Sequence, residues 1–153
     1  MAVLDSRASG SKRLDNVTRL DRNGGTAMLG TSKVHPILLS KDLDLSREFY
    51  HDRLGLDILS DTDHKIEFRC GGGTKLAVSK STIGTADSQT QIGWEVDDLQ
   101  KEIDDIRARG IPIQDYDLPD LKTHDGIADV GFAWMAWIID PGNNALAIVQ
   151  LKA

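Results

Sequence analysis

The stretch HPILLSKDL at residues 35–43 has a counterpart in QIGWEVDDL at residues 91–99. The offset between the two stretches is constant at 56 residues, as from His35 to Gln91 (91 − 35). The tripeptide LAV at 76–78 recurs as LAI at 146–148, where the offset is 70 residues (146 − 76). The chain therefore contains a duplicated unit, and the equivalent residues of its two copies should lie symmetrically around one shared cleft.

The bulk composition is that of a globular protein of one domain. With 153 residues, of which 40% are hydrophobic and 27% charged, the chain is long enough to bury a core. Its net charge of −6 argues against nucleic acid or an anionic membrane as a partner, because both need clustered Lys and Arg. No apolar run approaches the roughly 20 residues that span a bilayer. The single Cys70 cannot form an internal disulfide, which favours a cytoplasmic location.

The first copy predicts a β-α-β-β-β unit. Residues 34–40 form a short apolar run typical of a strand, and Asp42 or Asp44 can cap the helix that follows. Gly55 suits the position just after that helix. Further strands are expected at 57–60, 65–70 and 75–79. The helix should bury an apolar stripe made of Leu43, Phe49, Tyr50 and Leu54.

The second copy predicts the same order of elements. A strand is expected at 91–96, and Asp98 should open a helix that Gly110 ends. Strands should follow at 111–114, 132–139 and 145–150, with a turn over 140–144 signalled by Asp, Pro, Gly and Asn. The helix should bury Leu99, Ile103 and Ile106, which are spaced four and three residues apart.

The two copies differ by one insertion. The offset grows from 55 residues at Ile111 to 70 at Ala145, so the second copy carries about fifteen extra residues, which fall at 116–130. This segment holds Pro119, His124 and Gly126. An insertion beside a cleft favours a lid or substrate loop. A plain surface loop is the alternative, and the sequence leaves both open.

The N-terminal part of the chain stands apart. Residues 1–30 are expected to form a polar extension, because residues 1–27 are rich in Ser, Arg, Asp, Asn and Gly without a sustained period. A mobile extension and an arm packed on a partner are both compatible with this composition. Residues 31–153 should form a single domain, with modules over about 33–80 and about 90–151.

These features together resemble the vicinal oxygen chelate superfamily, which includes glyoxalase I, bleomycin-resistance proteins and extradiol dioxygenases. The matching residues are His35, KDL at 41–43, FY at 49–50 and LGL at 54–56, then VDDL at 96–99, GI at 110–111 and WIIDPGNNAL at 137–146. The resemblance covers residues 33–150. It implies an α+β fold in which two tandem βαβββ modules form a half-barrel cleft, and it implies a homodimer that binds a small molecule.

The resemblance also identifies four positions where metal-using members of the family place their ligands. In this sequence they are His35, Ala77, Gln91 and Ala147. An imidazole and an amide oxygen can coordinate a metal, whereas an alanine methyl cannot. A divalent ion needs three or four donors, with carboxylates balancing its charge. We therefore expect neither a metal nor another cofactor at these positions, although Glu67 next to His35 leaves a relocated divalent metal open.

Strand alternation predicts which side chains share the cleft with these positions. Because side chains alternate with a period of two, one face of each sheet should point into the cleft and the other should pack under a helix. Ile66, Phe68, Trp134, Ala136 and Ile138 should lie on the helix side. The predicted ligand-binding residues on the cleft side are Ile37, Glu67, Gln91, Glu95, Met135 and Trp137.

Two functions of different class follow. The first is a metal-free binding protein for a small, partly aromatic molecule, because Trp137 and Met135 offer an apolar wall beside a few polar groups. The second is a lyase, isomerase or dioxygenase-type enzyme, in which His35 and His124 are the candidate catalytic residues for proton transfer, with Gln91 or Glu67 assisting. The sequence leaves open whether the protein is an enzyme.

Overall fold

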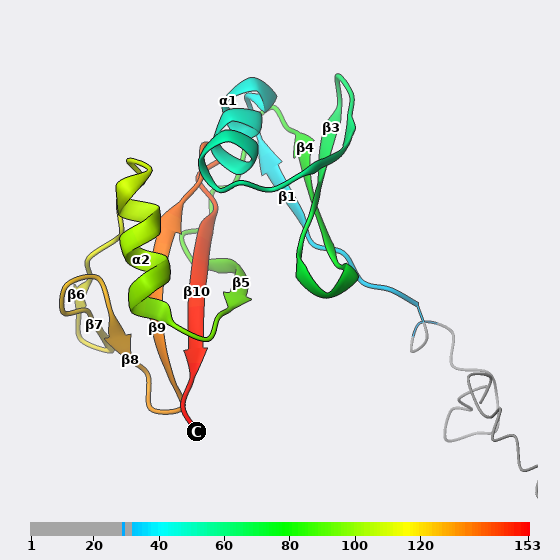
Figure 1. Ribbon diagram of the computed structural model, residues 1–153. Coiled ribbons are helices and arrows are strands. Elements are labelled where there is room, and N and C mark those ends of the chain that lie inside the picture. Colours follow the sequence, from blue (N-terminus) through cyan, green and yellow to red (C-terminus); the bar gives the residue numbers. More distant parts are fainter. Residues whose placement is uncertain (1–28, 30–31) are drawn as a thin grey trace, which may run out of the picture. The chain divides into compact units, whose positions relative to one another are not determined.

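A computed structural model describes residue 29 and residues 32–153. The polar extension expected at residues 1–30 lies outside the described residues, apart from Leu29. The unit considered below is His35–Ala153. It contains two modules in tandem, and Figure 1 labels their helices and strands.

The first module is a four-stranded mixed sheet with one helical segment. Its elements are β1 (Ile37–Ser40), α1 (Leu43–Arg47), the π-helix η1 (Glu48–Arg53), β2 (Ile58–Asp61), β3 (Lys65–Arg69), the short turn η2 (Gly71–Gly73) and β4 (Lys75–Lys80). The strand order is β1-β4-β3-β2, in which β1 and β4 run parallel and the other neighbours antiparallel.

The second module repeats this topology. Its elements are β5 (Thr90–Glu95), α2 (Leu99–Ala108), β8 (Ala128–Asp129), β9 (Ala133–Ile139) and β10 (Ala145–Leu151), in the strand order β5-β10-β9-β8. A small hairpin of β6 (Asp117–Leu118) and β7 (Leu121–Lys122) lies within the insertion. The α+β fold of two βαβββ-like modules predicted from the duplication is confirmed.

The strand register confirms the repeat residue by residue. Ile37 pairs with Ala77 in the first sheet, and Gly93 pairs with Ala147 in the second, which reproduces the offsets of 56 and 70 residues. On the other side of the same alanines, Glu67 pairs with Ala77 and Trp137 pairs with Ala147. Glu67 and Trp137 therefore occupy equivalent places in the two sheets.

The helix signals in the sequence act as expected. The Asp42 carboxylate accepts hydrogen bonds from the backbone N–H groups of Asp44 and Leu45, and the Asp98 carboxylate accepts one from Lys101. Of the two capping residues considered for the first helix, Asp42 is the cap. Gly55 and Gly110 follow the helices in the left-handed region that favours glycine, each with φ of +75°.

The first helix widens into a π-helix, a feature that the periodicity did not predict. The Leu54 backbone N–H donates to the Phe49 carbonyl at 2.9 Å, a bond from residue i to i+5. The wider turn lets two consecutive aromatic side chains, Phe49 and Tyr50, both reach the core, where they are 7% and 0% exposed. Such turns are rare and persist where tertiary contacts hold them.

One expected strand is absent from the described chain. Residues 111–114 form no strand, and the place of β2 in the second sheet is taken by β8, which pairs with β9. The segment still touches the sheet, because the Gln114 N–H donates to the Trp137 carbonyl at 2.8 Å. The insertion explains the difference, since it supplies the edge strand after the segment that the repeat predicted.

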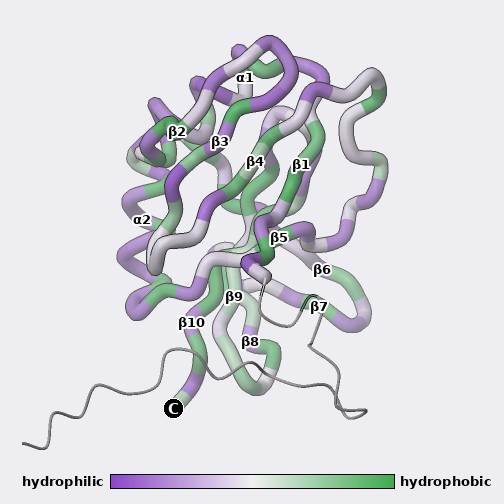
Figure 2. The backbone as a smooth tube through the Cα atoms, turned by 90° about the vertical axis from the view of Figure 1, so that its right-hand side faces the viewer, coloured by the Kyte–Doolittle hydropathy of each residue, from purple (hydrophilic) through white to green (hydrophobic). Residues whose placement is uncertain are grey.

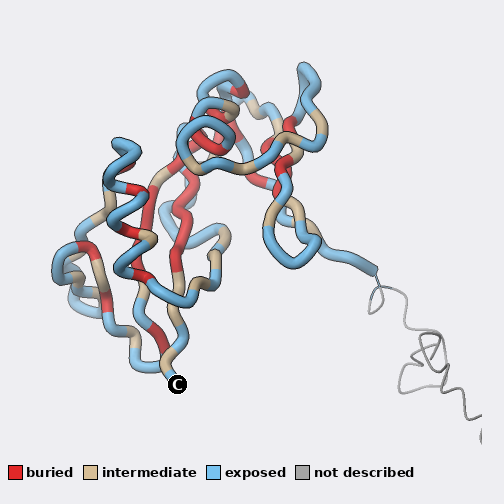
Figure 3. Tube along the Cα trace, viewed as in Figure 1, coloured by how far each residue is buried: buried red, intermediate tan, exposed pale blue. Residues whose placement is uncertain are grey.

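The hydrophobic core lies between the sheets and the helices and draws on both modules. α2 lies along β9 and β10, and the buried stretches of these strands are red in Figure 3. Figure 2 shows the same strands as mainly hydrophobic. The predicted helix-side residues Ile66, Phe68, Ala136 and Ile138 belong to this core. Trp134 does not, because it is 39% exposed and stacks with Lys152 instead.

The turn over residues 140–144 ties the second module to the first. The Tyr50 hydroxyl donates to the buried Asp140 carboxylate at 2.6 Å, and the Asn144 amide donates to the Leu39 carbonyl at 2.9 Å. A Cβ on Gly142 would lie 2.1 Å from that carbonyl oxygen, so only glycine permits the approach. Burial, and then the nearby Asp140 charge, raise the pKa of Tyr50 well above its ordinary value.

None of the helices in the described part of the chain is long and apolar enough to cross a membrane.

Candidate functional site

A pocket of about 330 Å³ lies on the face of the second sheet that points away from the core. The strands β9 and β10 form its floor, the linker before β5 forms one side, and the insertion covers it. We call it the Trp137 pocket. Its lining residues are Ser88, Gln89, Thr90, Tyr116, Leu118, Leu121, Trp137, Ile139, Asn143 and Ala145.

Trp137 is held in one orientation on the floor of this pocket. Its indole N–H donates to the Thr90 hydroxyl at 2.9 Å, and the Tyr116 ring meets its face edge-on, with centroids 5.5 Å apart and planes at 87°. Both contacts restrict rotation of the indole. The pairing of a fixed indole with a perpendicular ring is a favourable aromatic geometry.

The small residues beside Trp137 give the floor its shape. Ala147 and Ala128 are each 1% exposed and pack against the indole, and Met135 lies partly buried in the same cluster. Gly93, the cross-strand neighbour of Ala147, adds no side chain. The predicted cleft wall of Met135 and Trp137 therefore exists on this face of the sheet.

The roof of the pocket is fastened at its base by a short hydrogen-bond network. The Asp115 carboxylate accepts from the Thr123 hydroxyl at 3.1 Å and from the Gly126 N–H at 3.0 Å, and the Tyr116 N–H donates to the Thr123 hydroxyl at 2.8 Å. Gly126 has φ of +81°, and a Cβ there would lie 2.5 Å from Ile113. The insertion is thus a folded element packed over Trp137, and burial raises the pKa of Tyr116.

The equivalent face of the first module has a different chemistry. Glu67, in the place that corresponds to Trp137, forms ion pairs with Lys65 at 3.0 Å and with Lys75 at 3.2 Å. The two ammonium groups hold the pKa of Glu67 below its ordinary value. Ile37 on the same face is 65% exposed. This face is charged and open, in contrast to the covered face of the second module.

The four positions that the family resemblance assigned to metal ligands do not form a suitable donor set. Ala77 and Ala147 are buried and offer no donor, while Gln91 is exposed and its amide donates to the Gln89 carbonyl. His35 is half-buried, and its Nδ1 is buried without a hydrogen-bond partner among the described residues. Nowhere in residues 32–153 do three His, Cys, Asp or Glu side chains gather so that they could hold a metal ion.

The structure brings together only part of the predicted site. Trp137 lines the pocket and Met135 packs next to it. Four of the other predicted ligand residues do not line the pocket; they are Ile37, Glu67, Gln91 and Glu95. Neither candidate catalytic histidine lines it. His124 lies exposed on the insertion, where its backbone bridges to Ile127.

Sequence reasoning missed most of the roof and the polar side of the pocket. Tyr116, Leu118 and Leu121 form the roof, and the only signal for them was their apolar character within an otherwise polar insertion. Thr90 and Asn143 were not singled out, since a neutral polar residue in a linker or turn carries no local mark of a binding role.

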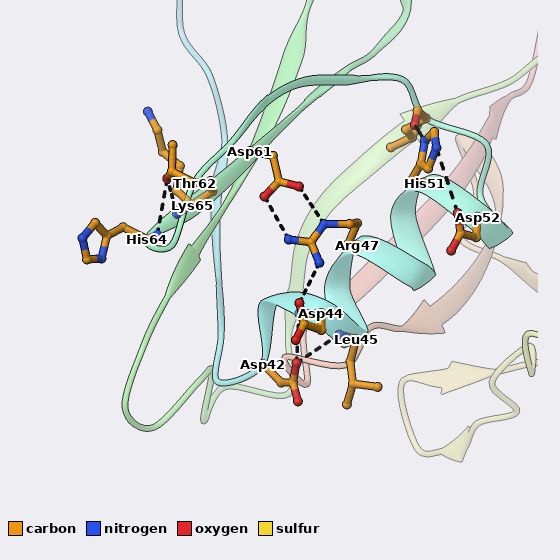
Figure 4. A network of polar contacts seen from close by, with 11 residues as sticks. Asp42, Asp44, Leu45, Arg47, His51, Asp52, Asp61, Thr62, His64 and Lys65 are labelled. Atoms are coloured by element: carbon orange, nitrogen blue, oxygen red, sulfur yellow. Dashed lines mark hydrogen bonds and ion pairs between the residues drawn. The ribbon is translucent and has the colours of Figure 1, made fainter.

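A second polar cluster lies at the start of the first helix, and its charges are already paired (Figure 4). The Arg47 guanidinium donates to Asp61 at 2.7 Å and to Asp44 at 2.7 Å, which joins α1 to β2. Its hydrogen bond holds the pKa of Asp61 below the ordinary value. Because Arg47 satisfies both carboxylates, this cluster has a structural explanation.

Comparison with known proteins adds the family. Residues 33–147 match the model of the Glyoxalase/Bleomycin resistance protein/Dioxygenase superfamily. No curated protein matches the sequence.

Solved structures show the same fold at low identity. A glyoxalase/bleomycin resistance protein/dioxygenase from Alicyclobacillus acidocaldarius is 22% identical, with a TM-score of 0.60 over 80% of this chain and 93% of that chain. A bleomycin-binding protein complexed with bleomycin is 22% identical, with a TM-score of 0.62 over 80% of this chain and 100% of the other. An antibiotic binding protein from a Streptomyces species is 18% identical, with a TM-score of 0.59 over 81% and 99%.

Proposed function

This chain belongs to the Glyoxalase/Bleomycin resistance protein/Dioxygenase superfamily, and on that premise we propose that it binds a small, partly aromatic molecule in the Trp137 pocket. The proposal includes no metal at the family's usual positions, because Ala77 and Ala147 leave too few donors there. The ligand would be held by stacking, apolar contact and hydrogen bonds.

The observation that carries the proposal is the covered indole. Trp137 lies flat on the floor of a concave, mostly apolar pocket with a few polar groups at one side, the usual composition of a small-molecule site. Fixing an aromatic surface before the ligand arrives lowers the entropic cost of binding. Two structural neighbours are described as binding bleomycin or an antibiotic, which supports a binding role for this fold.

Isothermal titration calorimetry with bleomycin, 2-naphthamide and quinoline tests the proposal. We expect at least one of these aromatic compounds to bind saturably. We also expect Trp137→Phe to weaken that binding by about tenfold, because the smaller ring loses stacking area and the bond to Thr90.

Trp134→Phe is the matched control, since Trp134 is 39% exposed and is not one of the residues lining the pocket. It should leave the affinity unchanged. An equal loss in the two variants, or the absence of binding by every compound, would contradict the proposal.

The second candidate function is an enzyme of the same superfamily, a lyase, isomerase or dioxygenase. The observation that favours it is the buried Nδ1 of His35, which has no hydrogen-bond partner within the described residues and so is free for proton transfer or for a relocated metal. Elemental analysis of protein purified without chelators separates the two functions. Stoichiometric zinc, nickel, manganese or iron that is lost in His35→Ala would support the enzyme.

Homodimerisation, which the family resemblance implies, is also a proposal for this chain. Sedimentation velocity at several protein concentrations tests it, and a single monomeric species throughout would count against it.

A further inference from the structure

The Trp137 pocket carries no charged side chain. Its ten lining residues include Trp, Tyr, Leu, Ile and Ala, and its polar members are only Ser88, Gln89, Thr90 and Asn143. In a chain that is 27% Asp, Glu, Lys and Arg, the neutrality of this lining is a distinct property of the site. By contrast, the equivalent face of the first module presents Glu67 between two lysines.

The neutral polar residues stand together on one side of the pocket. Ser88, Gln89 and Thr90 come from the linker into β5, and Asn143 comes from the turn before β10. Asn143 has φ of +66°, and its amide N–H₂ donates to the Thr85 carbonyl, which leaves its side-chain oxygen as an acceptor. The Thr90 hydroxyl accepts the Trp137 N–H and so can donate its own hydrogen.

These groups can satisfy donors and acceptors of a ligand but cannot neutralise a charge. Moving an ion from water into an apolar pocket is costly unless a counter-charge meets it. An uncharged amide, hydroxyl or carbonyl pays much less, because the polar side of the pocket can replace its hydrogen bonds with water.

We propose that the ligand of the Trp137 pocket is an uncharged planar aromatic compound with a hydrogen-bonding group at one edge. The ring would lie against Trp137 beneath Tyr116 and Leu121, and the edge group would face the side formed by Thr90 and Asn143. This inference rests on the proposed function and specifies the class of compound that the pocket accepts.

The test uses three compounds that share one ring and differ in charge: 2-naphthamide, 2-naphthoate and 2-naphthylmethylammonium. The readout is the indole N–H signal of Trp137 in ¹⁵N-correlated NMR spectra, identified by its loss in Trp137→Phe. Because this N–H bonds to Thr90 inside the pocket, a ligand there should move the signal. We expect 2-naphthamide to bind at least about tenfold more tightly than either ion, given the cost of burying an unpaired charge.

A charge placed in the lining should change the preference in a known direction. Gln89→Glu should shift the ratio of cation to anion affinity by about threefold or more in favour of 2-naphthylmethylammonium, as expected for a partly exposed ion pair. Gln100→Glu on the exposed side of α2 adds the same charge away from the pocket and should leave the ratio unchanged.

The outcomes separate this inference from the proposed function. If either ion binds as tightly as 2-naphthamide and moves the Trp137 signal, the pocket binds aromatic compounds but the requirement for an uncharged ligand is wrong. If none of the three compounds moves the signal in a folded protein, both the inference and the proposed function are contradicted. An equal response of the affinity ratio to Gln89→Glu and Gln100→Glu would also overturn the inference.

Discussion

Glu67 and Trp137 occupy one equivalent position in the two sheets and give the two faces opposite properties. Each is the cross-strand neighbour of the alanine that replaces a family metal ligand. At the first position two lysines neutralise a carboxylate, and at the second an indole makes a flat apolar floor. The difference between the modules, more than the symmetry between them, locates the binding site.

Tyr50 is the residue that most directly joins the modules, and its hydroxyl can be removed without a change of shape. Tyr50→Phe should lower the free energy of unfolding by about 1–3 kcal/mol, because the buried Asp140 carboxylate loses a donor. Urea denaturation measures this loss. Tyr116→Phe serves as the control, since the Tyr116 hydroxyl makes no hydrogen bond to the described residues, and an equal loss there would refute the assignment.

The same tyrosine predicts how stability responds to high pH. The folded-state pKa of Tyr50 is raised above its unfolded value, first by burial and then by Asp140. Its contribution is therefore complete below the unfolded pKa of about 10 and is lost as the pH rises above it, by up to about 1.4 kcal/mol per pH unit for one proton. Unfolding experiments between pH 9 and 11, to order of magnitude the relevant window, should show a shallower loss in Tyr50→Phe than in the natural chain. Parallel curves would contradict this role.

At the scale of elements, the insertion is the part that makes the second face a pocket. Its anchoring depends on Asp115, whose carboxylate holds Thr123 and Gly126. We predict that Asp115→Ala speeds amide hydrogen exchange over residues 116–130 and weakens aromatic binding, while exchange in β9 and β10 stays slow.

Asp117→Ala is the matched control for that experiment, because Asp117 lies on the exposed hairpin and pairs only with Lys122. It should change neither exchange nor binding. If Asp115→Ala leaves exchange over 116–130 unchanged, the proposed anchoring is wrong.

The order of elements was predictable because the duplication carries its own check. Each cap and each glycine at a helix end recurs at the same offset, so Asp42 and Asp98 support one another, as do Gly55 and Gly110. The same symmetry misled at residues 111–114, where it predicted a strand. The edge of the second sheet is formed by β8 instead, because the insertion brings another segment to that place.

At the scale of the whole molecule, the sequence predicted the faces of the sheets better than the site. Alternation with a period of two placed Met135 and Trp137 on one side and Ala136 and Ile138 on the other, as the structure has them. It could not place Tyr116 over Trp137, because that contact depends on how the insertion folds back. Nor could it show that Asp140, in an apparent surface turn, is buried against Tyr50.

The central claim is that an aromatic molecule binds against Trp137, and the fluorescence of that residue alone tests it most directly. The chain has three tryptophans, so the double variant Trp94→Phe, Trp134→Phe leaves Trp137 as the only one. Titrating this variant with bleomycin, 2-naphthamide and quinoline should give a saturable change in emission with at least one of them. No change with any of the three, in a variant that circular dichroism shows to be folded, would contradict the account.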